Sequence, residues 1–105
     1  MAKSSFETAL LEAIDKGLES LGESVKQAIY FHLEKGFNIP KQEIPNNIET
    51  FAAAVEKIFG MGANFLETLI LQELCEKTGL TGKEDSFKDL KFAEAVTAIK
   101  RKLEQ

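Results

Sequence analysis

The sequence is poor in the residues that build covalent or metal-bound scaffolds. It has one cysteine, Cys75, and no tryptophan. A single thiol excludes an internal disulfide and a cysteine-based zinc site, and it suits a reducing compartment. The N-terminus lacks the basic region, apolar core and cleavage site of a signal peptide, and no apolar run approaches the roughly 20 residues that span a bilayer. We therefore expect a cytoplasmic protein that makes no use of a membrane.

Positive charge is also in short supply. Lysine and arginine together number 13, against 17 aspartates and glutamates, for a net charge of −4. Binding to nucleic acid depends on clustered cations that neutralise phosphates. The basic run Lys100, Arg101 and Lys102 falls in the last turn of an expected helix, where positive charge complements the helix dipole. Binding of nucleic acid as a regulator is therefore the least favoured functional hypothesis.

No group of residues predicts catalysis. His32 is the only histidine, and at helical spacing it falls among Val25, Ala28 and Ile29. A general base needs an orienting partner and a substrate pocket, and the sequence indicates neither. A boundary histidine that bonds a backbone carbonyl is favoured instead. No Glu-x-x-His motif for a di-metal bundle occurs, and spacing alone places no two carboxylates to share a proton. We expect no enzyme activity, no cofactor and no metal.

What the chain does contain is helical periodicity. Apolar residues make up 44% of it and charged residues 29%, as in ordinary soluble globular proteins. Apolar side chains recur at the 3.6-residue period, and no period-two run is long enough for a strand. The prediction is an all-α fold, a single compact five-helix bundle formed by residues 1–105. The expected helices cover residues 5–21, 23–35, 47–59, 62–77 and the segment from Ser86 onward.

Glycine and proline mark the expected connections. Gly36 is predicted to end the second helix, and Pro40 to begin a single helical turn through Glu43. Gly79 is predicted to close the fourth helix, with Leu80 packing back against it. Ser86, followed three residues later by an aspartate, resembles a capping box for the last helix.

The Gly60-Met61-Gly62 segment lies between two of the expected helices. Phosphate-binding loops need a strand before the glycines, or a lysine and a serine or threonine after them. Here a helix precedes the glycines and Ala63-Asn64 follows them. A tight interhelical turn is therefore predicted, which aims the fourth helix into the bundle.

Two helices carry more apolar side chains than one buried face requires. Val25, Ala28, Ile29, His32 and Leu33 share the predicted core side of the second helix, and Phe31 projects elsewhere. The fourth helix is apolar almost all round, so it is either central or buried on a second face in an oligomer. Large apolar side chains outside a core commonly mark an interface. The predicted interface anchors are Tyr30, Phe31, Phe65 and Leu69.

Two segments resemble a known family. Residues 24–33, SVKQAIYFHL, and residues 44–70, IPNNIETFAAAVEKIFGMGANFLETLI, are similar to the Nitrosopumilus-type output domains, a small archaeal family. The shared features are the AIYFHLE string, a proline-containing loop, a helix centred on Phe51 and the IFGxGA corner. The resemblance implies an all-helical domain, often placed at the end of archaeal regulatory or signalling proteins. It implies no established chemistry and no catalytic residues.

The leading functional hypothesis is a noncatalytic protein-interaction module used in regulation. Its partner would be another protein or a second copy of the chain, as a homodimer or other homo-oligomer. The alternative is a small-molecule-binding domain with an apolar pocket between helices, in which Tyr30 and His32 supply the polar groups.

Overall fold

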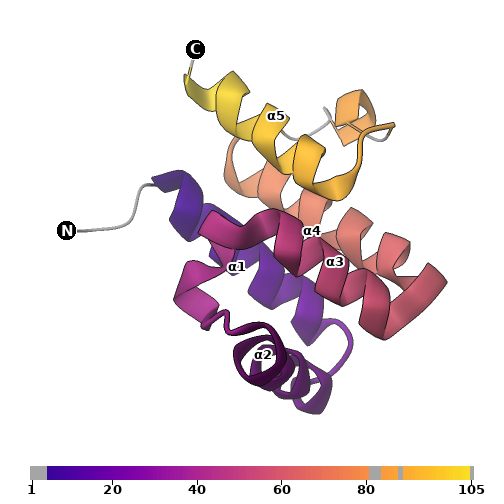
Figure 1. Cartoon of the computed structure of the whole chain (residues 1–105). Coiled ribbons are helices and arrows are strands. Elements are labelled where there is room, and N and C mark those ends of the chain that lie inside the picture. The colour runs from indigo at the N-terminus through magenta and orange to yellow at the C-terminus, as the bar shows by residue number, and fades with distance from the viewer. Residues whose placement is uncertain (1–4, 81–83, 88, 105) are drawn as a thin grey trace.

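The computed structural model describes residues 5–80, 84–87 and 89–104, and this part of the chain is all-helical, with no strand (Figure 1). The α-helices are α1 (Ser5–Glu19), α2 (Glu23–Phe37), α3 (Ile48–Phe59), α4 (Ala63–Lys77) and α5 (Phe92–Glu104). The 3₁₀ segments are η1 (Lys41–Asn47), η2 (Gly60–Gly62) and η3 (Glu84–Phe87).

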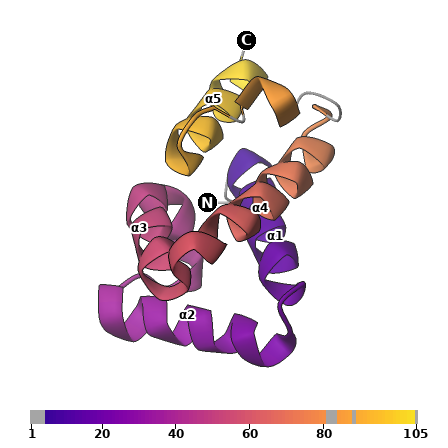
Figure 2. The same ribbon diagram turned by 90° about the vertical axis from the view of Figure 1, so that its right-hand side faces the viewer.

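The helix α4 is central, as predicted. It packs against α1, α3 and α5, whereas α2 packs against α1 and α3. Figure 2 shows α2 lying across one end of the molecule and α5 across the other, with α1 and α4 crossing between them. Side chains from all of these helices form one buried cluster, whose largest fully buried members include Leu10, Phe51, Leu66, Ile70 and Ile99.

A glycine inside α1 allows a close contact with α4. A Cβ atom added to Gly17 would lie 2.7 Å from Cγ1 of Ile70, a fully buried residue of α4. Real Cβ atoms essentially never come so close to another heavy atom. The backbones of α1 and α4 can therefore approach each other here only because residue 17 has no side chain.

Three predicted helix ends were wrong. The helix α2 continues through Gly36 to Phe37 and ends where Asn38 takes a left-handed conformation, φ 60°. Asparagine tolerates that conformation better than most residues. The turn at Pro40 extends to Asn47 as η1, with the buried Ile44 inside it. The first helix ends at Glu19, before Leu21.

The last helix begins later than predicted. Ser86 lies in η3, and α5 starts at Phe92. The N-terminus of α5 is held by the backbone N–H of Lys91, which donates to Oε1 of Glu94 at 3.1 Å. This is the glutamate half of a capping box, three residues from its partner. Glu94 therefore takes the role that the sequence suggested for the acidic residue after Ser86.

The end of α4 was predicted correctly. Gly79 has φ 81°, and its N–H donates to the carbonyl oxygen of Glu76 at 3.4 Å. The N–H of Leu80 reaches back to the carbonyl oxygen of Cys75 at 2.7 Å. These two bonds form a Schellman motif, and Leu80 packs against the core as its hydrophobic companion.

Candidate functional site

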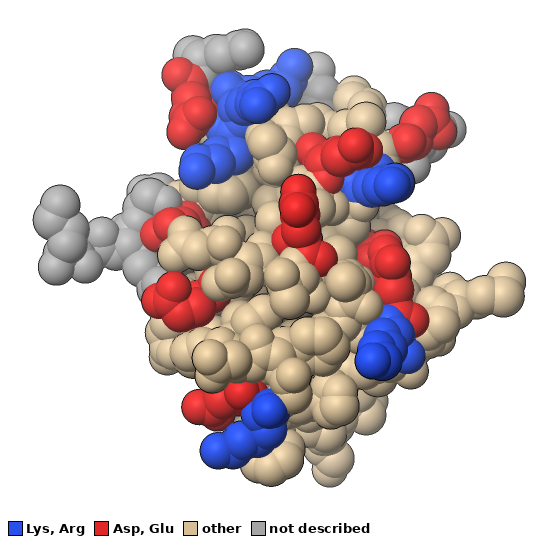
Figure 3. Space-filling view, in the orientation of Figure 1, with Lys and Arg blue, Asp and Glu red and all other residues tan. Residues whose placement is uncertain are grey.

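The turn between α3 and α4 presents an apolar knob to solvent. Gly60 takes a positive φ of 58°, which favours glycine, and η2 then leads directly into α4. Met61 at the tip is 98% exposed, and Phe65 in the first turns of α4 is 64% exposed. Ile58 at the end of α3 is exposed as well. We call Ile58, Met61 and Phe65 the apolar corner. Figure 3 shows uncharged side chains on the projecting edge at the right, where α3 turns into α4 in Figure 1.

The predicted anchors differ in their surroundings. Phe31 on α2 is 63% exposed, as the sequence suggested, whereas Leu69 on α4 is partly covered. Tyr30 is partly buried, and its hydroxyl is occupied within the chain. Phe31 and Phe65 stand on helices that both pack against α1 and α3. Sequence reasoning missed Met61, although a methionine between two glycines at a predicted turn was a readable signal of an exposed side chain.

Tyr30 belongs to a polar network that joins α2 to α1 and η1. Its hydroxyl donates to Oδ1 of Asp15 at 3.0 Å. Lys41 lies 3.3 Å from the same oxygen and 5.0 Å from the centroid of the Tyr30 ring. Burial raises the pKa of Tyr30, and the bond to Asp15 adds to that. Burial alone would raise the pKa of Asp15, but the bonds from Tyr30 and Lys41 and the charge of Lys26 lower it instead.

Lys26 is the centre of a second group of charges. Its Nζ lies 3.5 Å from Asp15, 3.2 Å from Glu19 and 3.3 Å from Glu23. The hydrogen bond to Glu19 is the main cause that raises the pKa of Lys26. Ala28 and His32, predicted to face the core, are exposed, and the buried positions of α2 are Lys26, Ile29 and Leu33. The predicted core face was therefore right at Ile29 and Leu33 and wrong at Ala28 and His32. It also missed Lys26, because a lysine covered by carboxylates can occupy a buried position that a pattern of apolar residues does not reveal.

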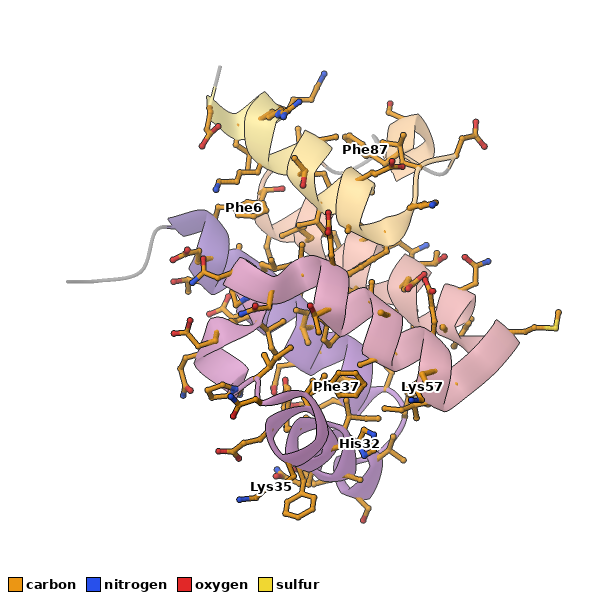
Figure 4. The ribbon with its side chains drawn as sticks, viewed as in Figure 1. Phe6, His32, Lys35, Phe37, Lys57 and Phe87 are labelled. Atoms are coloured by element: carbon orange, nitrogen blue, oxygen red, sulfur yellow. The ribbon has the colours of Figure 1, made fainter. Side chains whose placement is uncertain are left out.

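Tyr30 and His32 do not converge on one pocket. Residues two apart on a helix point in very different directions. Tyr30 reaches Asp15 on α1, whereas His32 is exposed and its ring centroid lies 5.9 Å from that of Phe37. Figure 4 shows the His32 and Phe37 rings next to each other at α2. The hollows described below are lined by neither Tyr30 nor His32. The predicted ligand pocket therefore gains no geometric support.

A buried carboxyl was also missed. Glu67 on α4 is only 9% exposed, and its Oε2 has no hydrogen-bond partner. The pKa of Glu67 is raised from 4.5 to about 7. Burial is the largest cause, and the charge of Glu56 on α3 and a hydrogen bond between the two carboxyl groups add to it. The two residues lie far apart in sequence, so spacing could not pair them. Glu67 lines none of the four hollows described below, whereas Glu56 lines one of the two smaller hollows between α3 and α5.

Among the described residues, two of the hollows have volumes that suit a ligand or side chains of a partner. One, of about 630 Å³, follows the outer side of α1 and is bordered by Asp15, Lys41 and Lys77. The other, of about 600 Å³, lies where the ends of α1, α4 and α5 meet, and we call it the end hollow. Its apolar walls are Phe6, Ala9 and Leu103, and Glu7, Lys77, Thr78, Lys100 and Glu104 complete its lining. Two smaller hollows, of about 320 and 340 Å³, lie between α3 and α5.

Comparisons with known proteins find no matching family model, no similar curated protein and no similar solved structure. Among the described residues, no group of three or more histidine, cysteine, aspartate or glutamate side chains could hold a metal ion. Within the same part of the chain, every helix is too short or too polar to cross a membrane. The function is therefore argued from the geometry of this chain.

Proposed function

We propose that this chain is a noncatalytic protein-interaction module that self-associates through its apolar corner. The exposure of Met61 is the observation that carries the proposal. A side chain held almost wholly in water between two glycines contributes nothing to the core and is accessible to another molecule. Methionine suits that role because its flexible, polarizable side chain adapts to a partner surface.

The neighbours of Met61 support the same role. Fully burying a phenylalanine or methionine side chain is worth about 1.5–3 kcal/mol, and the exposed part of Phe65 leaves much of that unused in the monomer. The cores of protein interfaces are enriched in aromatic residues and methionine and depleted of charge. Residues 57–65 contain a single charged residue, Lys57. Phe31 provides a second exposed aromatic contact on α2.

The regulatory role and the cellular compartment are proposed from the sequence alone. The resemblance to archaeal output domains supports a regulatory role in the cytoplasm, with residues 1–105 acting as one five-helix domain. Tyr30 is left out of the proposed contact, since it is partly buried and its hydroxyl is bound to Asp15 inside the molecule. Leu69, partly covered on α4, would contribute only at the edge.

Light scattering coupled to gel filtration, over a wide range of protein concentration, tests this function. The wild type is expected to gain mass with concentration, and Met61→Glu or Phe65→Glu to weaken association at least roughly tenfold. Both residues are exposed, so neither change disturbs the core. Leu90→Glu is the matched control, because Leu90 is also exposed but lies outside the corner. A wild type that stays monomeric throughout, or a corner variant that associates normally, would contradict the proposal.

A further inference from the structure

We propose that Glu56 and Glu67 form a proton-dependent clasp behind the apolar corner, so that self-association through the corner weakens as the pH rises. By the clasp we mean the two carboxyl groups, one on α3 and one on α4. This inference rests on the proposed self-association and adds its regulation. The ligand of the clasp is the proton, which lets one carboxyl group donate a hydrogen bond to the other.

The clasp lies about one helical turn behind the corner on both helices. Glu56 is in the last turn of α3, where its carbonyl oxygen accepts a hydrogen bond from the N–H of Gly60. Glu67 is in the second turn of α4, and only the three residues of η2 connect the two helices. Ile58 and Phe65 stand on the same two turns of helix as the clasp. Because the connection is so short, a change in the separation of the two carboxyl groups also changes the relative position of these two corner residues.

The position of Glu67 suits a neutral carboxyl group and not a charged one. Its side chain is nine-tenths buried, and its Oε2 is buried without a hydrogen-bond partner among the described residues. The group beside it is a second carboxyl, that of Glu56, with which it is hydrogen-bonded. Burial and a neighbouring negative charge both disfavour the ionised form. The pKa of Glu67 is about 7 for these reasons, so the clasp loses its proton near neutral pH.

The surroundings of the clasp supply no compensating cation. Among the described residues, no ion pair involves either carboxyl group. The described side chains of η2 and η3 carry no charge, and Glu12 of α1 is paired with Lys77 at the other end of α4. Lys57 is exposed and follows Glu56 directly in α3, and adjacent residues of a helix do not face each other. On the side toward α5, Glu56 shares a hollow with one lysine and two further glutamates, Lys91, Glu49 and Glu94.

Loss of the proton weakens association in two ways. Two carboxylates at hydrogen-bonding distance repel each other, so α3 and α4 separate at the clasp or Glu67 turns toward water. Either movement changes the arrangement of Ile58 and Phe65. Each corner also gains a negative charge, and like charges brought together at a contact cost binding free energy. The protonated clasp therefore belongs to the associating form, and association in turn raises the affinity of the clasp for its proton.

Sedimentation equilibrium of the wild type and two clasp variants tests this regulation. Between about pH 5 and about pH 8, the Kd of the wild type is expected to rise at least roughly tenfold, the factor that corresponds to a pKa change of one unit on association. Glu67→Gln stays neutral and keeps a donor for Glu56, so it should associate at pH 8 as tightly as the wild type does at pH 5. Glu56→Gln removes the charged neighbour but leaves Glu67 buried, so the pH dependence should move to lower pH.

Two controls separate the clasp from other titrating groups. His32 is the only histidine of the chain, and histidine ordinarily changes its charge in the same pH range. His32→Gln should therefore keep the pH dependence of the wild type. Glu76→Gln removes one negative charge from an exposed position of α4 and should keep it as well. Circular dichroism at both pH values would confirm that every variant is folded.

The outcomes separate this inference from the proposed function. If the wild type associates equally well at both pH values, the clasp is wrong and the proposed function stands. The same conclusion follows if the pH dependence survives in Glu67→Gln or disappears in His32→Gln. A wild type that is monomeric at every pH overturns both proposals.

Discussion

Glu67 is the residue at which burial and charge conflict most directly. Its carboxyl is nine-tenths covered and faces Glu56, and one of its oxygens has no partner. Because the folded state raises the pKa of Glu67 from 4.5 to about 7, the folded chain holds a proton that the unfolded chain releases between those values. The stabilising contribution is therefore fully present below about pH 4.5 and is lost as the pH rises through about 7.

We predict that Glu67→Gln removes this dependence. Near pH 5, glutamine and the protonated carboxyl should support similar free energies of unfolding. Near pH 8 the variant should be more stable than the wild type by on the order of 2 kcal/mol, because no charge is buried. Urea unfolding at both pH values measures the difference. Glu76→Gln, at an exposed position of the same helix, is the control. An equal difference between Glu67→Gln and the wild type at both pH values would rule out the assigned pKa.

The crossing of α1 and α4 depends on one absent side chain. Gly17 lies within α1, where helix propensity alone favours alanine by about 1 kcal/mol. The fold keeps glycine because a Cβ atom would meet Cγ1 of Ile70 at 2.7 Å. Gly36 in α2 is different, since a Cβ atom there would meet only the His32 ring, at 3.7 Å or more.

We predict opposite effects for alanine at these two glycines. Gly17→Ala should lower the free energy of unfolding by about 1–3 kcal/mol, because α1 and α4 must separate or Ile70 must leave its position. Gly36→Ala should raise it by up to about 1 kcal/mol through helix propensity, without a clash. Thermal and urea unfolding of the two variants compare them directly. If Gly17→Ala were as stabilising as Gly36→Ala, the close contact would be refuted.

At the scale of the whole molecule, the question is whether α2 belongs to the cooperative unit. It packs against α1 and α3 but lies across one end, away from α5 (Figure 2). Its buried Ile29 and Leu33 join the same core cluster as the side chains of α4. The chain also has one tyrosine, Tyr30 on α2, and no tryptophan, so tyrosine fluorescence reports on this helix alone.

We predict a single unfolding transition. The melting curve from tyrosine fluorescence should coincide with that from far-ultraviolet circular dichroism, which reports on all the helices. Measurement at low protein concentration keeps self-association from shifting the curves. If the fluorescence transition came at a lower temperature than the loss of helix, α2 would unfold separately and residues 1–105 would not form one cooperative unit.

The sequence determined the helical fold and its central helix. Local periodicity decides which segments are helical, and the apolar pattern of α4 showed that it needed covering on several sides. Three local features could also be predicted: the interhelical turn at Gly60, the end of α4 at Gly79 and the exposure of Phe31. Each of them depends on residues that lie close together in the chain. The later start of α5 was missed, although Glu94 carried a local signal.

Tertiary structure alone decided the rest. Glu56 and Glu67 meet because α3 and α4 pack together, and Lys26 is buried because carboxylates of both α1 and α2 surround it. The end hollow is formed by residues from three helices, and Gly17 matters only where it meets Ile70. These features arise between segments distant in sequence, and periodicity along one helix holds no information about the side chains that another helix brings to it.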